Sequence, residues 1–374
     1  MKRYLHKFNT NEHRSQYEGG VEYISPYTSL VYEDDSVHYN VFKAQLTLTN
    51  GHVITIPQNG NNTDSALTSA ETAEYKADIV DVVVGNRVKT LGSGVLSGCT
   101  NLENIEFSNS VTTIGSQSFR GCVGLTNVEM PNNVTTIGAS AFTSCSKLTE
   151  IKIPSGITTI NNSAFSGCTK LESVNLPSGL KTIGASAFTN CYSMTSITLP
   201  NGITSIGSKA FLYCRNLPNI VIPNTVTSIE RECFEYCSKL VEFTIPPLLK
   251  TITVELLVGT SIKHLDVPDS VTTMQRYAFS FMRELIDITI GVGISRIEEY
   301  TFVDCHKLIT LVIKNSSCIL ATTNAFNGTP IVGSGVGKIY VPYGYGDEFK
   351  ERANWSTFAS HIYELNEDGN IPTE

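Results

Sequence analysis

The sequence predicts a repeat solenoid in which each 23-residue unit adds one rung to a parallel stack. Cysteines recur at this period, apolar residues return at the same places in every unit, and proline follows most of the candidate strands. The in-phase cysteines are Cys99, Cys122, Cys145, Cys168, Cys191, Cys214, Cys237 and Cys305. The first seven recur in exact register with the period, and the last returns three periods later, less one residue.

Ten units begin at apolar residues between Val88 and Ile294. Eight positions into each unit lies a bulky apolar residue, which is phenylalanine in six consecutive units: Phe119, Phe142, Phe165, Phe188, Phe211 and Phe234. The eighth unit is one residue short, and Thr260 and Met282 replace the cysteine in the eighth and ninth units. Like residues at fixed spacing predict continuous buried columns along the stack.

Each unit divides into three elements, which the third unit illustrates. Residues 134–137 read Val-Thr-Thr-Ile and predict a short extended segment on one wall. Residues 141–145, Ala-Phe-x-x-Cys, predict one tight helical turn. Residues 148–153, Leu-x-x-Ile-x-Ile, alternate as a half-buried strand does, and Pro154 ends the strand because proline cannot donate to a ladder.

Stacking is required because one unit cannot fold alone. Seven buried apolar side chains contribute roughly 14 kcal/mol, whereas ordering the backbone costs about 1–2 kcal/mol for each residue. One parallel strand per unit at ~4.8 Å spacing predicts a rod on the order of 50 Å long.

Residues 41–87 are predicted to cap the first unit, after an N-terminal segment at 1–40. Asn50-Gly51 separates two alternating runs, which is the strongest short signal for a β-hairpin. A polar loop at 58–64 follows, and Ile79, Val82 and Val84 repeat the strand spacing as a degenerate unit.

The ten units occupy 88–316, and residues 317–374 are predicted to form a C-terminal cap repeat and helix. Ala325-Phe326 keeps the turn signature, and residues 339–341 supply a last strand. Residues 347–365 have apolar side chains at mixed helical spacing and predict a capping helix. Trp355 is expected to pack over the last unit.

The cysteines are expected to be buried, reduced thiols. No close C-x2-C pair of the kind that binds zinc occurs, and side chains stacked in parallel have poor geometry for disulfides. Cys233 and Cys318 lie out of phase, so an exposed thiol is an alternative at either position.

Composition excludes several function classes. The formal net charge is −8 and no Lys/Arg-rich run occurs, which argues against nucleic acid as a partner. No run of about 18 apolar residues is present, so membrane insertion is not expected. Nucleophile-elbow, zinc-protease, P-loop and dinucleotide motifs are missing. We therefore expect no enzyme activity, no cofactor and no metal site. His264, Asp266 and Asp287 predict a small polar cluster, most simply as part of a solvated face.

The repeat V-T-T-I-G-x-x-A-F-x-x-C-x-x-L-x-x-I-x-I-P resembles the BspA-type leucine-rich repeat over residues 88–341. The resemblance implies a curved leucine-rich-repeat solenoid, used for adhesion to host proteins or other cells by surface proteins of gut and oral bacteria. Residues 338–342 and 354–356 are similar to the terminal unit of such proteins, and residues 37–40 resemble N-terminal segments of repeat proteins from gut Bacteroidetes and their phages. The resemblance points to a cell-surface or secreted location, although residues 1–8 lack the apolar region of a secretory signal, which leaves a virion or the cytoplasm as alternatives.

The best candidate site is the exposed side of the Ile-x-Ile strands. Its predicted binding residues are Asn104, Glu106, Asn127, Glu129, Glu150, Lys152, Asn175, Thr198, Asn219, Glu242 and Thr244. This row is acidic near the N-terminal end, is neutral in the middle, and lacks the aromatic anchors typical of protein hot spots. A binding face and a merely solvated face fit it equally well.

Two functions therefore stay open for a monomeric chain. The first is a binding or adhesion module that presents the sheet face to a protein or glycan. The alternative is a phage or prophage tail-associated structural or receptor-binding protein.

Overall fold

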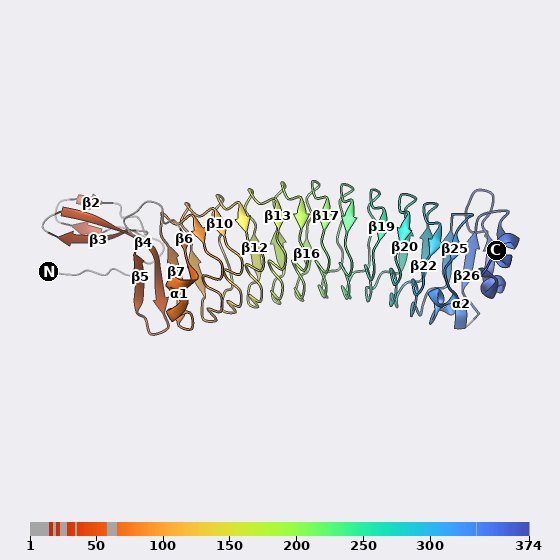
Figure 1. Ribbon diagram of the computed structural model, residues 1–374, viewed down its shortest axis with the longest axis horizontal. Coiled ribbons are helices and arrows are strands. Elements are labelled where there is room, and N and C mark those ends of the chain that lie inside the picture. The colour runs from red at the N-terminus through yellow and green to blue at the C-terminus, as the bar shows by residue number, and fades with distance from the viewer. Residues whose placement is uncertain are drawn as a thin grey trace.

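The computed structural model describes residues 15–17, 20–22, 28–33, 36–57, 66–333 and 335–373. The rungs follow one another along an elongated rod, from β7 near one end to β26 near the other (Figure 1). The predicted segment at 58–64 lies outside the described residues, as does most of 1–27. The predicted repeat solenoid with parallel strands is confirmed.

The Leu-x-x-Ile-x-Ile segments form a wall of parallel strands that we call the Ile-x-Ile sheet. Its strands are β7 (Ile79–Val84), β9 (Asn104–Glu106), β12 (Glu150–Lys152), β14 (Ser173–Asn175), β16 (Ser196–Ile197), β20 (His264–Val267), β22 (Asp287–Ile290), β24 (Thr310–Ile313), β26 (Lys338–Val341) and β27 (Ile362–Glu364). Glu150 pairs with Ser173, and Ser173 pairs with Ser196, so the register follows the 23-residue period. The ladder is interrupted at three units. Residues 127–129 form no strand, and Asn219 and Glu242 form only an isolated bridge.

The Val-Thr-Thr-Ile segments form a second parallel wall, the Thr-Ile sheet. Its strands are β6 (Ala66–Leu67), β8 (Thr90–Leu91), β10 (Thr113–Ile114), β11 (Thr136–Ile137), β13 (Thr159–Ile160), β15 (Thr182–Ile183), β17 (Ser205–Ile206), β18 (Ser228–Ile229), β19 (Thr251–Ile252), β21 (Thr273–Met274), β23 (Arg296–Ile297) and β25 (Ile319–Leu320). Thr251 pairs with Thr273, which is one residue nearer in the chain than a full period, so the short eighth unit is absorbed without loss of register.

A third side, which we call the turn wall, connects each Thr-Ile strand to the next Ile-x-Ile strand. The structure has two tight turns here in place of the expected helical turn. Ser140 and Ser144 of the third unit have φ of 57° and 62°, a left-handed conformation that ends a right-handed helix. The N–H groups of Ser140, Phe142 and Ser144 donate to carbonyl oxygens of the next unit, so this wall is also hydrogen-bonded from rung to rung.

The phenylalanines form a buried column between the walls. From Phe119 to Phe234 each ring stacks on the next, with centroids 5.0–5.6 Å apart. Leu257 interrupts the column, which resumes at Phe279 and continues through Phe302 to Phe326. Stacked aromatic rings add about 0.5–1.5 kcal/mol per pair beyond the burial of their area.

The cysteines form a second column of free, buried thiols. Each in-phase Sγ from Cys122 to Cys237 donates to a carbonyl oxygen of the preceding unit, as from Cys168 to Phe142 at 3.1 Å. Burial raises the pKa of Cys99 to about 11 and that of Cys237 to about 12. The out-of-phase Cys233 and Cys318 are buried as well, so neither is the exposed thiol that the sequence left open.

The N-terminal end is closed by the predicted hairpin. Strands β4 (Ser36–Leu48) and β5 (Val53–Pro57) pair antiparallel around Asn50-Gly51, and β4 also pairs antiparallel with β7. Strands β1 (Ser15–Tyr17) and β2 (Gly20–Glu22) pair with each other, and β3 (Thr28–Glu33) pairs with β4. The degenerate unit includes β6, α1 (Ser69–Thr72), η1 (Ala73–Tyr75) and β7. Buried Lys43 pairs with Glu71 at 2.9 Å, which ties the hairpin to this unit.

The C-terminal cap differs from the single helix expected over 347–365. After η2 (Thr323–Phe326) and α2 (Pro330–Gly333), the cap has two short helices, α3 (Gly346–Glu351) and η3 (Trp355–His361), and then the unpredicted strand β27. Asn354 separates the helices because it adopts φ of 63°, and its amide donates to the carbonyls of Leu320 and Ala321. Trp355 is fully buried, and its indole N–H donates to the backbone carbonyl of Cys318.

Candidate functional site: the outer face of the Ile-x-Ile sheet

Alternation along each strand divides the side chains between the core and the outer face of the Ile-x-Ile sheet. In β12, Ile151 is buried, whereas Glu150 and Lys152 are exposed. Because the register follows the repeat, each exposed side chain lies beside its counterpart in the next paired unit. All eleven predicted residues are exposed: Asn104, Glu106, Asn127, Glu129, Glu150, Lys152, Asn175, Thr198, Asn219, Glu242 and Thr244.

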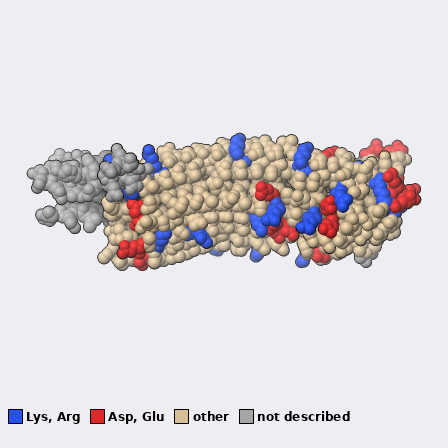
Figure 2. Space-filling view, in the orientation of Figure 1, with Lys and Arg blue, Asp and Glu red and all other residues tan. Residues whose placement is uncertain are grey.

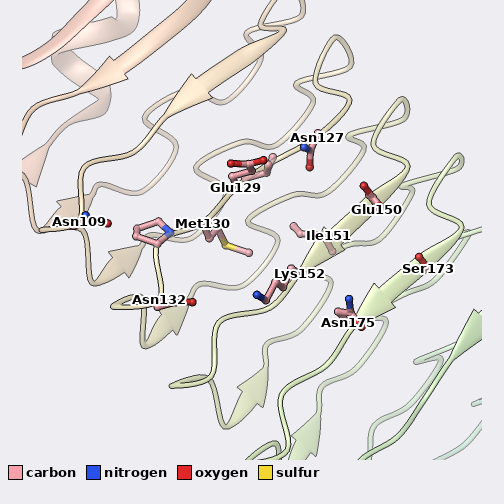
Figure 3. A pocket seen from close by; sticks show the side chains of 12 residues that line it. Asn109, Asn127, Glu129, Met130, Asn132, Glu150, Ile151, Lys152, Ser173 and Asn175 are labelled. Atoms are coloured by element: carbon pink, nitrogen blue, oxygen red, sulfur yellow. The ribbon is translucent and has the colours of Figure 1, made fainter. Parts of the chain in front are cut away.

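Five of these residues line one open hollow of about 530 Å³, and they come from three consecutive units (Figure 3). They are Asn127, Glu129, Glu150, Lys152 and Asn175. The hollow lies where residues 127–129 leave the ladder between β9 and β12. Its lining combines carboxylates, one ammonium group and several amides, which suits a ligand rich in hydrogen-bonding groups.

Sequence reasoning missed Met130, Asn109 and Asn132, which line the hollow, and counted Ser173 only among the exposed strand positions. Ser173 occupies the same strand position as Glu150, while Met130, Asn109 and Asn132 lie just beyond the strands. Asn109 and Asn132 are one full period apart, so the period itself contained the signal for them. The period does not encode the break in the ladder beside which they converge.

The remaining predicted residues lie elsewhere on the face. Asn104 donates to Asp81 at 2.8 Å and is thereby held against the neighbouring strand. Asn219 and Glu242 share a backbone bridge. Near them Val221 is 81% exposed, so the middle of the face is partly apolar.

The predicted histidine cluster forms in part. His264 on β20 hydrogen-bonds to Asp287 on β22, and both side chains are exposed. Asp266 is also exposed on β20, where its backbone pairs with Thr289. An exposed pair of this kind contributes little to stability.

Charged side chains are unevenly distributed along the molecule. In Figure 2 the larger clusters of acidic and basic groups lie over the C-terminal half of the visible face. Glu232, Glu235 and Glu255 form the one group of three among the described residues with carboxylate oxygens within 4.8 Å of one another. Burial, together with the Glu232 and Glu255 carboxylates, raises the pKa of Glu235 to about 7.

In the described part of the chain, no helix has the length and apolar character needed to cross a bilayer.

Comparison with known proteins identifies the repeat. The family profile described as "BspA type Leucine rich repeat region (6 copies)" matches residues 70–191, 158–286 and 204–332, which together span more than half of the chain. Comparison with curated proteins gives no match.

Solved structures of bacterial leucine-rich repeat proteins are similar in fold. A leucine-rich repeat protein from Bacteroides ovatus aligns over 92% of this chain and 100% of its own, with a TM-score of 0.58 and 20% identity. The pneumococcal vaccine antigen PcpA aligns over 84% of both chains, with a TM-score of 0.52 and 17% identity. A leucine rich cell surface protein from Faecalibacterium prausnitzii aligns over 90% of this chain and 97% of its own, with a TM-score of 0.49 and 22% identity.

Proposed function

This chain belongs to the BspA type leucine-rich repeat family, and we propose that it is a non-enzymatic adhesion module whose outer Ile-x-Ile sheet face binds a protein or glycan at a bacterial cell surface. Leucine-rich repeats in bacterial proteins of the same fold support a binding role at the level of the repeat. One observation carries the choice of face: five predicted residues from three units line the same hollow.

The chemistry of the hollow supports a polar partner. Glu129 and Glu150 are exposed carboxylates, Lys152 is an exposed cation, and Asn127 and Asn175 offer both donors and acceptors. A hydroxyl-rich glycan or a polar loop of a protein fits this lining better than an apolar ligand does.

The test is binding of the whole chain to immobilised host extracellular proteins and to arrayed bacterial glycans. The variant carries Glu129→Lys and Glu150→Lys, which reverse both carboxylates of the hollow. We expect the captured partner to bind at least 10-fold more weakly, equivalent to about 1.4 kcal/mol. Both side chains are exposed, so the melting temperature should not change.

The matched control carries Glu367→Lys and Asp368→Lys, the same change in net charge at exposed residues near the C-terminus. Equal loss of binding in both variants would indicate a general effect of charge. Unchanged binding in the first variant would remove the hollow as the docking site.

A further inference from the structure

The turn wall has a row of positions where the backbone must be left-handed. The second such residue of each unit is Gly98, Gly121, Ser144, Gly167, Asn190, Tyr213, Tyr236, Gly259, Phe281, Asp304 or Gly328, and all have φ between 55° and 83°. Most are glycine or a small polar residue, as this conformation favours. Tyr213, Tyr236 and Phe281 are exceptions, since a left-handed backbone is unfavourable for residues with bulky side chains. Backbone strain of this kind is often retained at functional sites.

The aromatic side chains of this row lie at the surface. Tyr236 is 42% exposed and Phe281 37% exposed. Tyr213 and Tyr236 stack with centroids 5.1 Å apart and planes inclined by 5°. We call Tyr192, Tyr213, Tyr236 and Phe281 the aromatic patch. It lies on a different wall from the hollow and is independent of it.

Gly259 interrupts the aromatic row. It lies in the unit between Tyr236 and Phe281, and a Cβ there would come within 2.6 Å of the Tyr236 ring. The ring therefore leans over the Gly259 backbone, where a side chain would collide with it. Two rungs of ~4.8 Å separate the units of Tyr236 and Phe281, so these two positions lie roughly 10 Å apart along the rod.

The patch already binds a cation of its own chain at its other end. The Arg215 guanidinium carbon lies 5.1 Å from the ring centroids of both Tyr192 and Tyr213. This distance is within the range of a cation–π interaction. One face of Tyr192 and one face of Tyr213 are therefore oriented to accept a guanidinium group.

Acidic residues in the units of Tyr236 and Gly259 favour a cation as well. Glu235 directly precedes Tyr236, and its carboxylate lies within 4.8 Å of those of Glu232 and Glu255. Among the described ion pairs, Lys209 and Arg231 both contact Glu232, and neither is paired with Glu235 or Glu255. Burial raises the pKa of Glu235, the Glu232 and Glu255 carboxylates raise it further, and the charge of Lys209 offsets this rise only in part.

We propose that the aromatic patch docks a basic segment of a partner protein, with a Lys or Arg side chain placed against the exposed surfaces of the Tyr236 and Phe281 rings. The ring faces supply cation–π contacts, and the neighbouring carboxylates supply charge complementarity. Arg215 on Tyr192 and Tyr213 shows the same contact made within the chain. Arginine and tyrosine are also enriched among residues that dominate binding energy at interfaces.

The test uses the whole chain and a fluorescent peptide with two arginines separated by glycine. The variant carries Tyr236→Asn and Phe281→Asn, because asparagine tolerates the left-handed backbone and removes the rings. We expect peptide affinity to fall at least 10-fold in the variant. We expect a similar fall when citrulline, which keeps the shape but not the charge, replaces arginine in the peptide.

Two controls separate the patch from other effects. Tyr343→Asn removes a tyrosine that is 55% exposed near the C-terminus and should leave peptide affinity unchanged. The Glu129→Lys and Glu150→Lys variant should bind the peptide with an affinity within twofold of that of the parent chain. This control distinguishes failure of the aromatic-patch proposal from failure of the sheet-face proposal. The variants must keep the parent's melting profile.

Three results would overturn the proposal. The first is equal peptide affinity of the parent and the double asparagine variant, and the second is equal affinity of the parent for the arginine and citrulline peptides. The third is a double asparagine variant that loses binding to a neutral glycan but keeps its peptide affinity. The last result would assign the rings to sugar stacking.

Discussion

The outer face of the Ile-x-Ile sheet and the turn wall are built from the same 23-residue unit, yet they constrain their side chains differently. Exposed positions of an extended strand accept almost any residue, so the polar row from Asn104 to Thr244 reveals little by composition alone. At the second left-handed position of each unit on the turn wall, eight of the eleven residues are glycine, serine, asparagine or aspartate. An aromatic residue such as Tyr236 is therefore more informative there than a glutamate is on the sheet.

The largest expected effect comes from the core that both walls share. Phe165→Ala removes a fully buried ring from the middle of the unbroken column and should destabilise the chain by about 3–5 kcal/mol. Phe281→Ala, at an exposed ring on the turn wall, should cost less than about 1 kcal/mol. Denaturant unfolding of both variants measures the difference, and similar losses would mean that the core has been misassigned.

Glu235→Gln tests the electrostatics of the turn wall. The pKa of Glu235 is raised to about 7, so the folded chain holds this proton more tightly than the unfolded chain does. Its contribution to stability is therefore greatest below about pH 4.5 and decreases as pH rises to about 7. After allowance for solvent screening, the variant should be more stable than the parent at pH 7.5 by about 1 kcal/mol, with no gain at pH 4.5. A gain of equal size at both pH values would contradict this account.

A pair of glycine substitutions compares the two walls directly. Ser144 on the turn wall is left-handed, so Ser144→Gly should stabilise the chain by about 0.5–1 kcal/mol. Ser173 lies in the extended strand β14, so Ser173→Gly should destabilise it by about 0.5–1 kcal/mol. Differential scanning calorimetry would detect the opposite signs, and shifts in the same direction would argue against the two-wall comparison.

The smallest expected effect is a chemical one. Because burial raises the thiol pKa values, the ten cysteines should not react with a thiol reagent in the folded chain at pH 8. All ten should react after unfolding in guanidinium chloride. Rapid reaction of Cys233 or Cys318 in the folded chain would show that an out-of-phase cysteine is accessible after all.

The repeat made the stack predictable because a fixed period places like residues in columns whatever the surface contains. Phe119 to Phe234, the cysteine column and the one-residue lapse before Ile262 all follow from spacing. The hairpin at Asn50-Gly51 was equally local, because the turn residues define it.

Spacing could not predict the hollow or the C-terminal cap, because both depend on local departures from the repeated backbone. The hollow lies where residues 127–129 leave the ladder, although the apolar pattern of their unit matches that of units that stay in it. The C-terminal cap depends on one residue, Asn354, which separates the two short helices. Its backbone is left-handed, and its side-chain amide donates to the distant carbonyls of residues 320 and 321. Tyr213 and Tyr236 are one period apart, so spacing contained the signal for their stacking, whereas their left-handed backbone and the contact of the Tyr236 ring with Gly259 depend on the turns.

Hydroxyl-radical footprinting of the whole chain, free and with each ligand bound, tests most directly whether the two walls have separate partners. Met130 lines the hollow, whereas Tyr236 and Phe281 lie on the turn wall. We predict that the captured protein or glycan protects Met130 and leaves both aromatic residues reactive, and that the arginine peptide does the reverse. Protection of both walls by one ligand, or of neither by both, would contradict the account.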